Sequence, residues 1–597
     1  MNPNSTPAAT ERPDLAGQPL VINGKPSLSN RPDRYLQHGF HFHADNCIGC
    51  HACETACAEK NALPSHLSFR KVGYIEGGSY PDYLRINISM ACNHCEDPVC
   101  LKGCPTLAYT KYLEYGAVIQ DSDICFGCGY CTWVCPYNAP VLDPVKGEVQ
   151  KCNMCIDRLE EELKPACVSA CLSNALEFGA MVSASTSNHS QKVIESLPAG
   201  RQQAKRTLPG FPNPEITRPN IRFEQTRSLP ITFARPDNEP LIYERNGQGG
   251  CGKEDFRVKP LDRNDPKEWG LSHLRSREDS LVLFTLLSQG VVGGFILLFL
   301  MTKLFSASLS PLLVRATLFG LFGLQTAGMV FSTFHLGKPR FFYRAINNLR
   351  HSWVSREIAT MGAFHALLGG YALVTTFPGL LSWLPNPLPG MVPDLFGWGA
   401  AGMGILGLFC MIRCYRIPAR PFWDHWHTAG AFTASALILG SLAIGLLAGP
   451  ITFPFLAWAL VAGLLLQGVS LLAHARYLDR RGEEAAVSRQ ITLTQFGKSY
   501  TARFGTLGVL MAVALFFALR PLLAGGGGPA QGAHLLWGGL FLLALIHEVV
   551  GRALFYVAVV PTTIPGAFFW GNRSFQDHAR KSGLANLPQV GVAPEKH

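Results

Sequence analysis

The chain has 597 residues, too many for a single compact core, so at least two domains are expected. Charged residues make up 16% of the chain, well below the roughly 25% of an average soluble domain. Hydrophobic residues make up 48%, the net charge is +10 and the mean hydropathy is +0.14. Sixteen of the nineteen cysteines fall between Cys47 and Cys171. These features exclude a disordered chain, an entirely soluble enzyme and a protein that is only a membrane bundle.

Residues 1–40 are expected to form a polar N-terminal tail. They contain neither a long apolar stretch nor a twin-arginine pair, so we expect no export signal. We therefore expect a cytosolic setting, in which thiols stay reduced and densely spaced cysteines bind metal rather than form disulfides.

Residues 41–180 contain four groups of four cysteines among short strands such as Tyr83–Ser89, in which apolar and polar residues alternate. Three thiolates two residues apart on a tight loop can reach three irons of one cubane, and a fourth then points toward a second cluster. The groups are Cys47, Cys50, Cys53 and Cys57; Cys92, Cys95, Cys100 and Cys104; Cys125, Cys128, Cys131 and Cys135; and Cys152, Cys155, Cys167 and Cys171. Soft thiolates favour iron–sulfur clusters. The alternatives are zinc sites, which more often use paired Cys-x2-Cys units, and disulfides.

Residues 181–275 are rich in Pro, Arg, Asn and Gly and show no sustained periodicity, so we expect an extended strap. A flexible tether and a segment that wraps a partner both fit this composition. Cys251 lies in the strap, and the sequence assigns it no role.

Long apolar runs dominate residues 276–570, and each approaches the roughly 20 apolar residues that span a bilayer as a helix. We expect an all-α bundle of about eight transmembrane helices, with seven or nine as alternatives, followed by a C-terminal tail at 571–597. The expected spans are Leu281–Met301, Leu312–Phe334, Ile358–Phe377, Phe396–Ile412, Ala429–Leu447, Phe455–Ala473, Phe504–Leu519 and Leu535–Tyr556.

Lysine and arginine residues gather on one side of these spans, which the positive-inside rule assigns to the cytoplasm. On that side lie Arg275, Arg277, Lys338, Arg340, Arg344, Arg350, Arg356, Arg413, Arg416, Arg420, Arg476, Arg480, Arg481, Arg489, Lys498 and Arg503. The other side has Lys303, Arg315 and Arg520. We therefore expect a multi-pass protein of the cytoplasmic (inner) membrane, with both termini and the cysteine-rich domain in the cytoplasm.

The runs CIGCHACETAC, CNHCEDPVC and CFGCGYCTWVCPYNAP closely resemble the four-cluster iron–sulfur subunits of the dimethyl sulfoxide reductase family of molybdopterin enzymes. The resemblance covers residues 41–180 and implies a bis-ferredoxin-like α+β domain, in which each cluster draws ligands from two groups. The implied sets are Cys47, Cys50 and Cys53 with Cys171; Cys57 with Cys152, Cys155 and Cys167; Cys92, Cys95 and Cys100 with Cys135; and Cys104 with Cys125, Cys128 and Cys131. Some nitrate-reductase-like relatives replace one third-group cysteine and hold a three-iron cluster. Because Cys131 is present here, four 4Fe–4S clusters are favoured.

The stretch His335-Leu-Gly-Lys-Pro339, which leaves the second span and continues to Glu357, resembles a loop of the haem-free, eight-span anchor subunits of the same family. A weaker resemblance extends over residues 280–570. It implies that His335 lies at the headgroup of a quinone (ubiquinone or menaquinone) and that Glu357 belongs to the same pocket. Arg344 and Arg356 are candidates for holding the carboxylate or the quinone oxygen.

These four residues also have ordinary explanations. A histidine at a helix end is stabilised by the helix dipole, and Glu357 at a helix start is a cap-like charge. The positive-inside rule accounts for Arg344 and Arg356 without any site.

Other polar residues in the spans allow more than one interpretation. Glu548 and Arg552 can form an i,i+4 pair rather than a proton path, and Cys410 and Cys414 are expected to be small packing residues. Haem would need histidines paired across facing spans, whereas most histidines lie at predicted span ends, so no haem is expected. Those histidines are His335, His365, His427, His474, His534 and His547.

We expect a natural fusion of the electron-transfer subunit and the membrane anchor of a molybdopterin oxidoreductase. Quinol oxidation releases two protons with two electrons, and because clusters take only electrons, a group that titrates near neutral pH must handle the protons. A separate molybdopterin-containing catalytic subunit is implied, with membrane lipid and the quinone pool as the other partners and no nucleic acid.

The resemblance leaves the terminal substrate open. The family's exported reductases place their catalytic side outside the membrane, whereas the loop charges here place it inside, which favours sulfite:quinone oxidoreduction. Menaquinol-dependent reduction of dimethyl sulfoxide, another oxide or polysulfide is the alternative. A redox-sensing transporter is a further alternative, which predicts an inverted repeat of spans that is not visible in the sequence.

Overall fold

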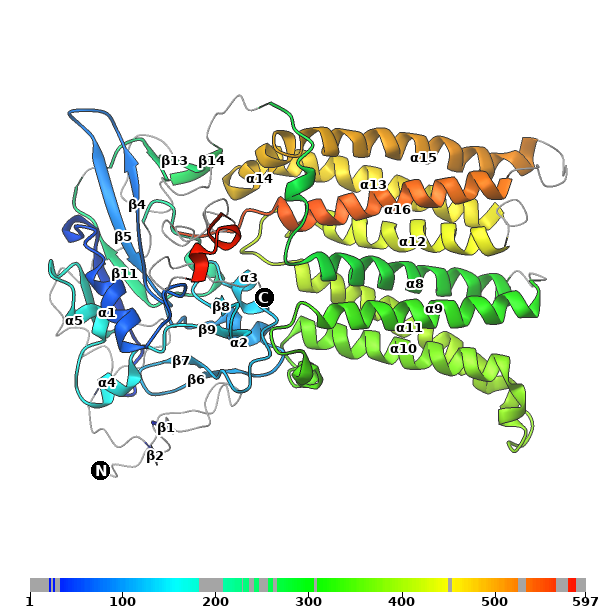
Figure 1. Ribbon diagram of the computed structural model, residues 1–597, viewed down its shortest axis with the longest axis horizontal. Coiled ribbons are helices and arrows are strands. Elements are labelled where there is room, and N and C mark those ends of the chain that lie inside the picture. The colour runs from blue at the N-terminus through cyan, green and yellow to red at the C-terminus, as the bar shows by residue number, and fades with distance from the viewer. Residues whose placement is uncertain are drawn as a thin grey trace. The chain divides into compact units, whose positions relative to one another are not determined.

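The contacts in the computed structural model divide the chain into two units, each described here by itself (Figure 1). Unit 1 comprises residues 1–261 and 561–597, and unit 2 comprises residues 262–560. The described residues are 21–22, 25–26, 33–181, 208–227, 229–235, 241–245, 256–260, 266–304, 309–448, 454–523, 533–564 and 578–586. Cys251 lies outside them.

The first sheet of unit 1 joins the two ends of the cysteine-rich region. Strand β3 (His38–His43) pairs antiparallel with β10 (Leu176–Ala180) and parallel with β11 (Ile221–Glu224). Phe40 and Phe42 of β3 are 2% and 1% exposed, so the sheet forms part of the core. Because β3 and β10 stand at opposite ends of the cysteine-rich region, their pairing closes it into one folded body.

The second sheet is a hairpin extended by strands from the expected strap. Strand β4 (Lys71–Gly77) pairs with β5 (Leu84–Met90), which begins and ends one residue later than the sequence predicts. Strand β12 (Thr232–Ala234) pairs with β4, and β13 (Leu241–Arg245) and β14 (Phe256–Pro260) continue the sheet. The described strands of the strap therefore pair with the cysteine-rich region.

Shorter elements complete unit 1. They are strands β1 (Val21–Ile22), β2 (Lys25–Pro26), β6 (Tyr109–Lys111), β7 (Val118–Gln120), β8 (Val141–Asp143) and β9 (Glu148–Gln150), and helices α1 (Ala52–Lys60), α2 (Val99–Gly103), α3 (Tyr130–Val134), α4 (Ile156–Glu160) and α5 (Ala166–Ser169). The predicted α+β class of this region is confirmed.

Unit 2 contains, within its described residues, eight helices that are long and apolar enough to cross a membrane, as the sequence predicts. They are α8 (Asp279–Leu304), α9 (Pro311–Thr333), α10 (Trp353–Thr376), α11 (Leu388–Tyr415), α12 (Trp426–Ala448), α13 (Pro454–Arg481), α15 (Gly497–Leu523) and α16 (Ala533–Val557). Helix α14 (Glu483–Leu493) lies between α13 and α15 in the sequence. Several helices extend past the apolar runs because helical hydrogen bonding continues into polar residues. Helix α11, for example, begins at Leu388 rather than at Phe396.

Several residues of the charge pattern lie inside helices rather than between them, among them Arg356 in α10, Arg413 in α11 and Arg476 in α13. Arg503 is expected in a loop on the positive side, but it lies inside α15 and is only 7% exposed. The apolar run begins at Phe504, whereas the helix already begins at Gly497, so the first two turns of the helix were mistaken for a loop.

The helices of unit 2 form two groups of four (Figure 1). Helices α8 to α11 contribute most of one apolar core, and α12, α13, α15 and α16 contribute most of another. The groups meet where α8 contacts α12. A Cβ atom added to Gly293 would lie 1.9 Å from the carbonyl oxygen of Ala436, and one on Gly440 would lie 2.5 Å from the carbonyl carbon of Gly293. Small residues thus let two membrane helices touch through their backbones.

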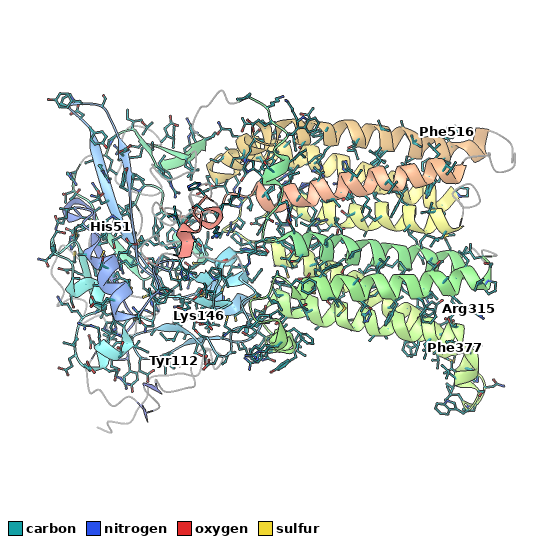
Figure 2. The ribbon with its side chains drawn as sticks, in the orientation of Figure 1. His51, Tyr112, Lys146, Arg315, Phe377 and Phe516 are labelled. Atoms are coloured by element: carbon teal, nitrogen blue, oxygen red, sulfur yellow. The ribbon has the colours of Figure 1, made fainter. Side chains whose placement is uncertain are left out.

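The two ends of the helical unit can be followed in Figure 2. Arg315 near the start of α9, Phe377 just after α10 and Phe516 late in α15 are labelled at one end. Because successive helices alternate in direction, the end of α9 and the start of α10 lie at the opposite end. His335 and Glu357 therefore belong to the same end of the bundle.

We expect Gly293→Ala to destabilise the helical unit by about 1–3 kcal/mol, because the new methyl group overlaps a backbone carbonyl that cannot rotate away. Thermal unfolding of the full-length protein in detergent measures the effect. Gly320→Ala on α9 is the matched control, since no atom lies within 4 Å of the added Cβ. Equal midpoints for the two variants would contradict a tight contact between α8 and α12.

Candidate functional site

The cysteine groups sit on loops that turn sharply before short helices. Gly127 and Gly129 in the third group both have φ of +75°, a left-handed conformation that glycine adopts without strain, and α3 follows directly. In the fourth group Met154 and Cys155 have φ of +63° and +50° just before α4. These turns let thiols two or three residues apart approach one point.

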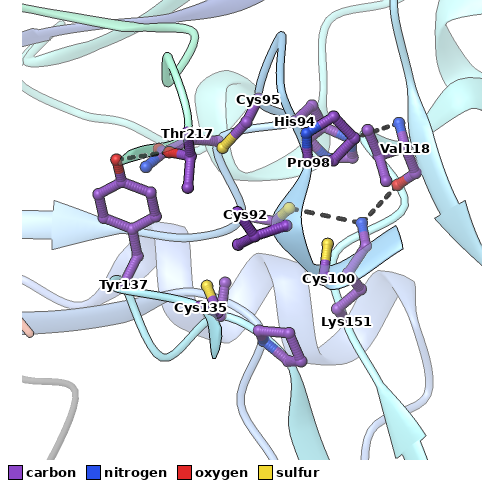
Figure 3. Close-up of a pocket in the computed structure, with 14 residues that line it drawn as sticks. Cys92, His94, Cys95, Pro98, Cys100, Val118, Cys135, Tyr137, Lys151 and Thr217 are labelled. Atoms are coloured by element: carbon purple, nitrogen blue, oxygen red, sulfur yellow. Dashed lines mark hydrogen bonds between the residues drawn. The ribbon is translucent and has the colours of Figure 1, made fainter. Parts of the chain in front are cut away.

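One implied set of thiols lines a single cavity. Cys92, Cys95 and Cys100 from the second group and Cys135 from the third surround it (Figure 3). Four thiols that converge on one cavity form a ligand set of the kind that holds an iron–sulfur cluster.

The other three implied sets also come together. Their thiols lie within electrostatic reach of one another: Cys47 with Cys50, Cys53 and Cys171; Cys57 with Cys155 and Cys167, and Cys152 with Cys57 and Cys155; and Cys131 with Cys104, Cys125 and Cys128. Thiols of different sets also lie within electrostatic reach, such as Cys53 with Cys167 and Cys152 with Cys92. No three His, Cys, Asp or Glu side chains of the described residues are arranged closely enough to hold a metal ion. The division into four sets therefore stays a prediction.

The chemistry of these thiols fits metal binding. Burial, reinforced by the neighbouring thiols, raises the pKa of Cys47 to about 11 and of Cys57 to about 12. All eighteen described cysteines are free, with no disulfide among them. Without a metal these thiols stay protonated at neutral pH, so a bound cation is needed to make them thiolates.

Two buried cations beside the thiols were missed by the sequence analysis. Lys151 Nζ lies 3.4 Å from Cys92 Sγ and donates to the carbonyl of Cys152 at 2.9 Å (Figure 3 shows the contact with Cys92). Arg70 is 1% exposed and lies within electrostatic reach of thiols of the first and fourth groups. Lys151 precedes Cys152 in the sequence, so its place beside the thiols could have been predicted. No cysteine stands near Arg70 in the sequence, so its place could not.

The expected quinone residues occupy two segments at one end of the helical unit. His335 follows α9 and is partly exposed, and its Nδ1 atom has no hydrogen-bond partner in the described structure. Burial, with the positive charge of Arg277, lowers the pKa of His335 to about 4, so the ring is neutral at pH 7 and titrates below the near-neutral range expected of the proton-handling group. Glu357 in α10 is 7% exposed and accepts a hydrogen bond from Cys414 Sγ at 3.1 Å.

The two candidate arginines have other contacts. Arg356 Nε donates to the carbonyl of Leu349 at 2.9 Å, and its guanidinium carbon lies 4.4 Å from the centre of the Trp353 ring. The guanidinium carbon of Arg344 lies 4.2 Å from the centre of the Phe341 ring. Both side chains thus brace the loop between α9 and α10, at the end of the bundle that carries His335.

Buried polar residues near Glu357 were also missed. Cys414, expected as a packing residue, is a hydrogen-bond donor to Glu357. The next residue, Tyr415, lies with its hydroxyl 2.6 Å from that of Tyr556. The spacing of Cys410 and Cys414 placed them on one helix face but could not show that Glu357 lies opposite.

Both units match known families. Residues 274–557 match the family described as DMSO reductase anchor subunit (DmsC), and residues 85–181 match the 4Fe-4S dicluster domain. An anaerobic dimethyl sulfoxide reductase chain of Escherichia coli (strain K12) is 38% identical over 218 residues, which cover 35% of this protein and 97% of the relative. A sulfite dehydrogenase subunit of Allochromatium vinosum is 39% identical over 154 residues, 22% of this protein and 64% of the relative.

These matches cover unit 1 and unit 2 separately, and they agree with the thiol sets and the eight helices. They support iron–sulfur clusters in unit 1 and a multi-pass membrane anchor in unit 2. The protein therefore belongs to the dimethyl sulfoxide reductase family, as an iron–sulfur electron-transfer subunit fused in one polypeptide to the family's membrane anchor subunit.

Proposed function

We propose that the protein carries electrons through four 4Fe–4S clusters between a quinone at the His335 end of the helical unit and a molybdopterin-containing catalytic subunit. The observation that carries the proposal is the sequence's four groups of four cysteines, of which Cys92, Cys95, Cys100 and Cys135 line a single cavity. A 4Fe–4S cluster, once bound, supplies a one-electron carrier.

The residues of unit 1 hold the clusters and set their surroundings. Thiolates of each set bind the irons, and Arg70 and Lys151 place positive charge beside the first, second and fourth groups. Buried cations stabilise the more negative, reduced state, so these two residues favour electron acceptance.

The residues of unit 2 handle the protons of quinone chemistry. The neutral ring of His335 can accept a proton from a quinol hydroxyl, and its unpartnered Nδ1 atom is available for that bond. Glu357, held by Cys414, is the second proton acceptor of the pocket.

Sulfite oxidation is the favoured overall reaction. The loop charges favour a cytoplasmic catalytic side, and the Allochromatium vinosum relative, named for sulfite dehydrogenase, is similar to this protein in the cysteine-rich region. Reduction of dimethyl sulfoxide or a similar compound by menaquinol is the second candidate, supported by the Escherichia coli relative named for dimethyl sulfoxide reductase.

The purified protein is expected to contain iron and acid-labile sulfide equivalent to about four cubanes. Cys131→Ser should lower the iron and sulfide contents and alter the electron paramagnetic resonance spectrum of one cluster, because Cys131 is expected to bind only that cluster. Cys410→Ser, a buried cysteine of α11 outside the four groups, is the control and should leave the iron content unchanged. Zinc in place of iron, or no inorganic sulfide, would overturn the proposal.

His335→Ala should abolish reduction of the clusters by quinol. It should leave their reduction by dithionite and their magnetic resonance signals intact, since the expected cluster ligands are cysteines of unit 1. His351→Ala, in the same loop between α9 and α10, is the matched control and should retain quinol-dependent reduction. If quinol still reduces the clusters of the His335 variant at the original rate, the quinone binds elsewhere.

A fluorescent protein fused to the C-terminus should be fluorescent, as expected for a cytoplasmic location, and alkaline phosphatase fused there should be inactive. The same reporters fused after Ser310, before α9, should give the opposite results because only α8 precedes them. An active phosphatase at the C-terminus would remove the support for sulfite oxidation and favour the reductase.

A further inference from the structure

Besides Glu357, three charged side chains are buried inside the described membrane-spanning helices of unit 2. Glu548 and Arg552 lie on α16 and Arg503 on α15, and they are 3%, 4% and 7% exposed. Charged groups inside a bilayer are costly, and where they occur they commonly mark the path of an ion or a proton. None of the three has a part in the proposed quinone site.

Neutral partners hold Arg552. Its Nη2 atom donates to Gln289 Oε1 at 2.7 Å and to Ser435 Oγ at 3.2 Å, and its guanidinium carbon lies 3.8 Å from the centre of the Phe432 ring. Arg552 and Glu548 thus meet at Ser435 rather than in the direct ion pair considered from their i,i+4 spacing.

Ser435 can serve Glu548 in two protonation states. Its Oγ atom lies 2.6 Å from Glu548 Oε2 and 2.8 Å from the backbone oxygen of Ala431. A hydroxyl carries one hydrogen, so Ser435 donates either to the carboxylate or to the carbonyl. When it turns to Ala431, its oxygen can accept a hydrogen bond from the protonated acid. Arg552 donates to Ser435 in both arrangements, so no backbone movement is needed.

Further polar atoms around this carboxyl have no hydrogen-bond partner in the described structure. They are Glu548 Oε1, Arg552 Nη1, Arg503 Nε and His547 Nε2. Buried polar atoms are nearly always satisfied, by protein or by bound water. A Cβ added to Gly551 would lie 2.3 Å from Arg503 Nη2, so the glycine makes room for that guanidinium beside α16.

A row of histidines leads inward from the start of α12. The rings of His425 and His474 are 5.6 Å apart and those of His474 and His427 are 4.5 Å apart, stacked in both cases. His425 is partly exposed, whereas His474 and His427 are 4% and 8% exposed. The row therefore runs from the surface into the bundle.

The row continues toward Glu548 along α12. His427 and Ser435 are eight residues apart, so they lie on the same side of the helix about two turns from each other. Arg503 and Arg552 are within electrostatic reach of both His427 and Glu548. The two guanidinium groups thus lie near both the last histidine and the carboxyl.

We propose that Glu548 is a proton-binding site inside the membrane, and that His425, His474 and His427 connect it to water at the start of α12. The rings are stacked, and His474 Nε2 bonds the carbonyl of Phe422 and His427 Nδ1 bonds Ser470 Oγ rather than each other. Water molecules between the rings therefore carry the proton from one imidazole to the next, and it finally forms an O–H bond with the carboxylate; no electron moves. The titratable and charged groups that face the site are Arg552 and His547 on α16, Arg503 on α15 and His427 on α12, while α8 contributes the uncharged Gln289. The proposal does not depend on quinone binding at His335, so either can fail alone.

Infrared spectra of the full-length protein in lipid nanodiscs, recorded over a range of pH, test the site directly. We expect a carbonyl band of a protonated carboxyl group that titrates and is absent in Glu548→Gln. Ser435→Ala should move this band to higher frequency because a hydrogen bond is lost. Ser441→Ala, another buried serine of α12 that donates to a backbone carbonyl within its helix, should leave the band in place. A spectrum that Glu548→Gln does not change would show that Glu548 stays ionised as a structural counter-ion, and would overturn the proposal.

Exchange into heavy water tests the route. The same band shifts when the acid takes up deuterium, and we expect His474→Phe to slow that shift by about tenfold or more, because a proton relay is interrupted. His365→Phe is the matched control, since His365 stacks on Phe322 at 4.2 Å and lies on α10, outside the row. Unchanged exchange in the His474 variant would overturn the route even where the titrating band is present. A thermal unfolding midpoint in detergent equal to that of the unmodified protein shows that the helical unit of the variant is folded.

Discussion

Thiolates buried close together repel one another, and only positive charge among them can hold them in place. In the proposed arrangement each cluster draws thiols from two cysteine groups that are separate in the sequence, so this constraint acts on the loops of unit 1. Bound iron would supply positive charge there, and Arg70 and Lys151 add positive charge from within the core. Since ligands from two groups meet at each cluster, cluster binding and the folding of unit 1 depend on each other.

Unit 2 also holds buried polar groups in place, but it does so with neutral hydrogen-bond donors. Its helices are apolar on the outside, and the backbone contact between Gly293 and Gly440 packs α8 against α12 without any charge. Polar groups appear at two places, around Glu357 and around Glu548, and in both a carboxyl is held by a neutral donor from a neighbouring helix, Cys414 or Ser435. A neutral donor costs little when the carboxyl changes its protonation state, whereas a direct ion pair would fix the negative charge.

Local patterns made much of this architecture predictable. The spacing of the cysteines indicated their grouping, and the apolar runs indicated eight helices, because both signals lie within a few neighbouring residues. The pairing of ligand groups came from a resemblance to a known family. What could not be predicted depends on contacts between distant residues. The burial of Arg503 in α15 could not be predicted, because its neighbours Glu548 and Gly551 lie on α16. The sequence around Arg70 likewise contains none of the cysteines that Arg70 lies near.

The strands of the strap and the last residues of the polypeptide have a consequence for assembly. Residues 561–597 belong to unit 1, where Arg235 donates to the carbonyls of Thr563 and Ile564. Both ends of the helical bundle are therefore tied to the same folded body. The connections at both ends are also bonded to unit 2: the backbone N–H of Glu268 donates to the carbonyl of Thr494, and that of Val560 donates to Ser488 Oγ at 3.0 Å. Because the electron-transfer unit is covalently joined to its own anchor at two points, its local concentration there does not depend on the concentration of the protein.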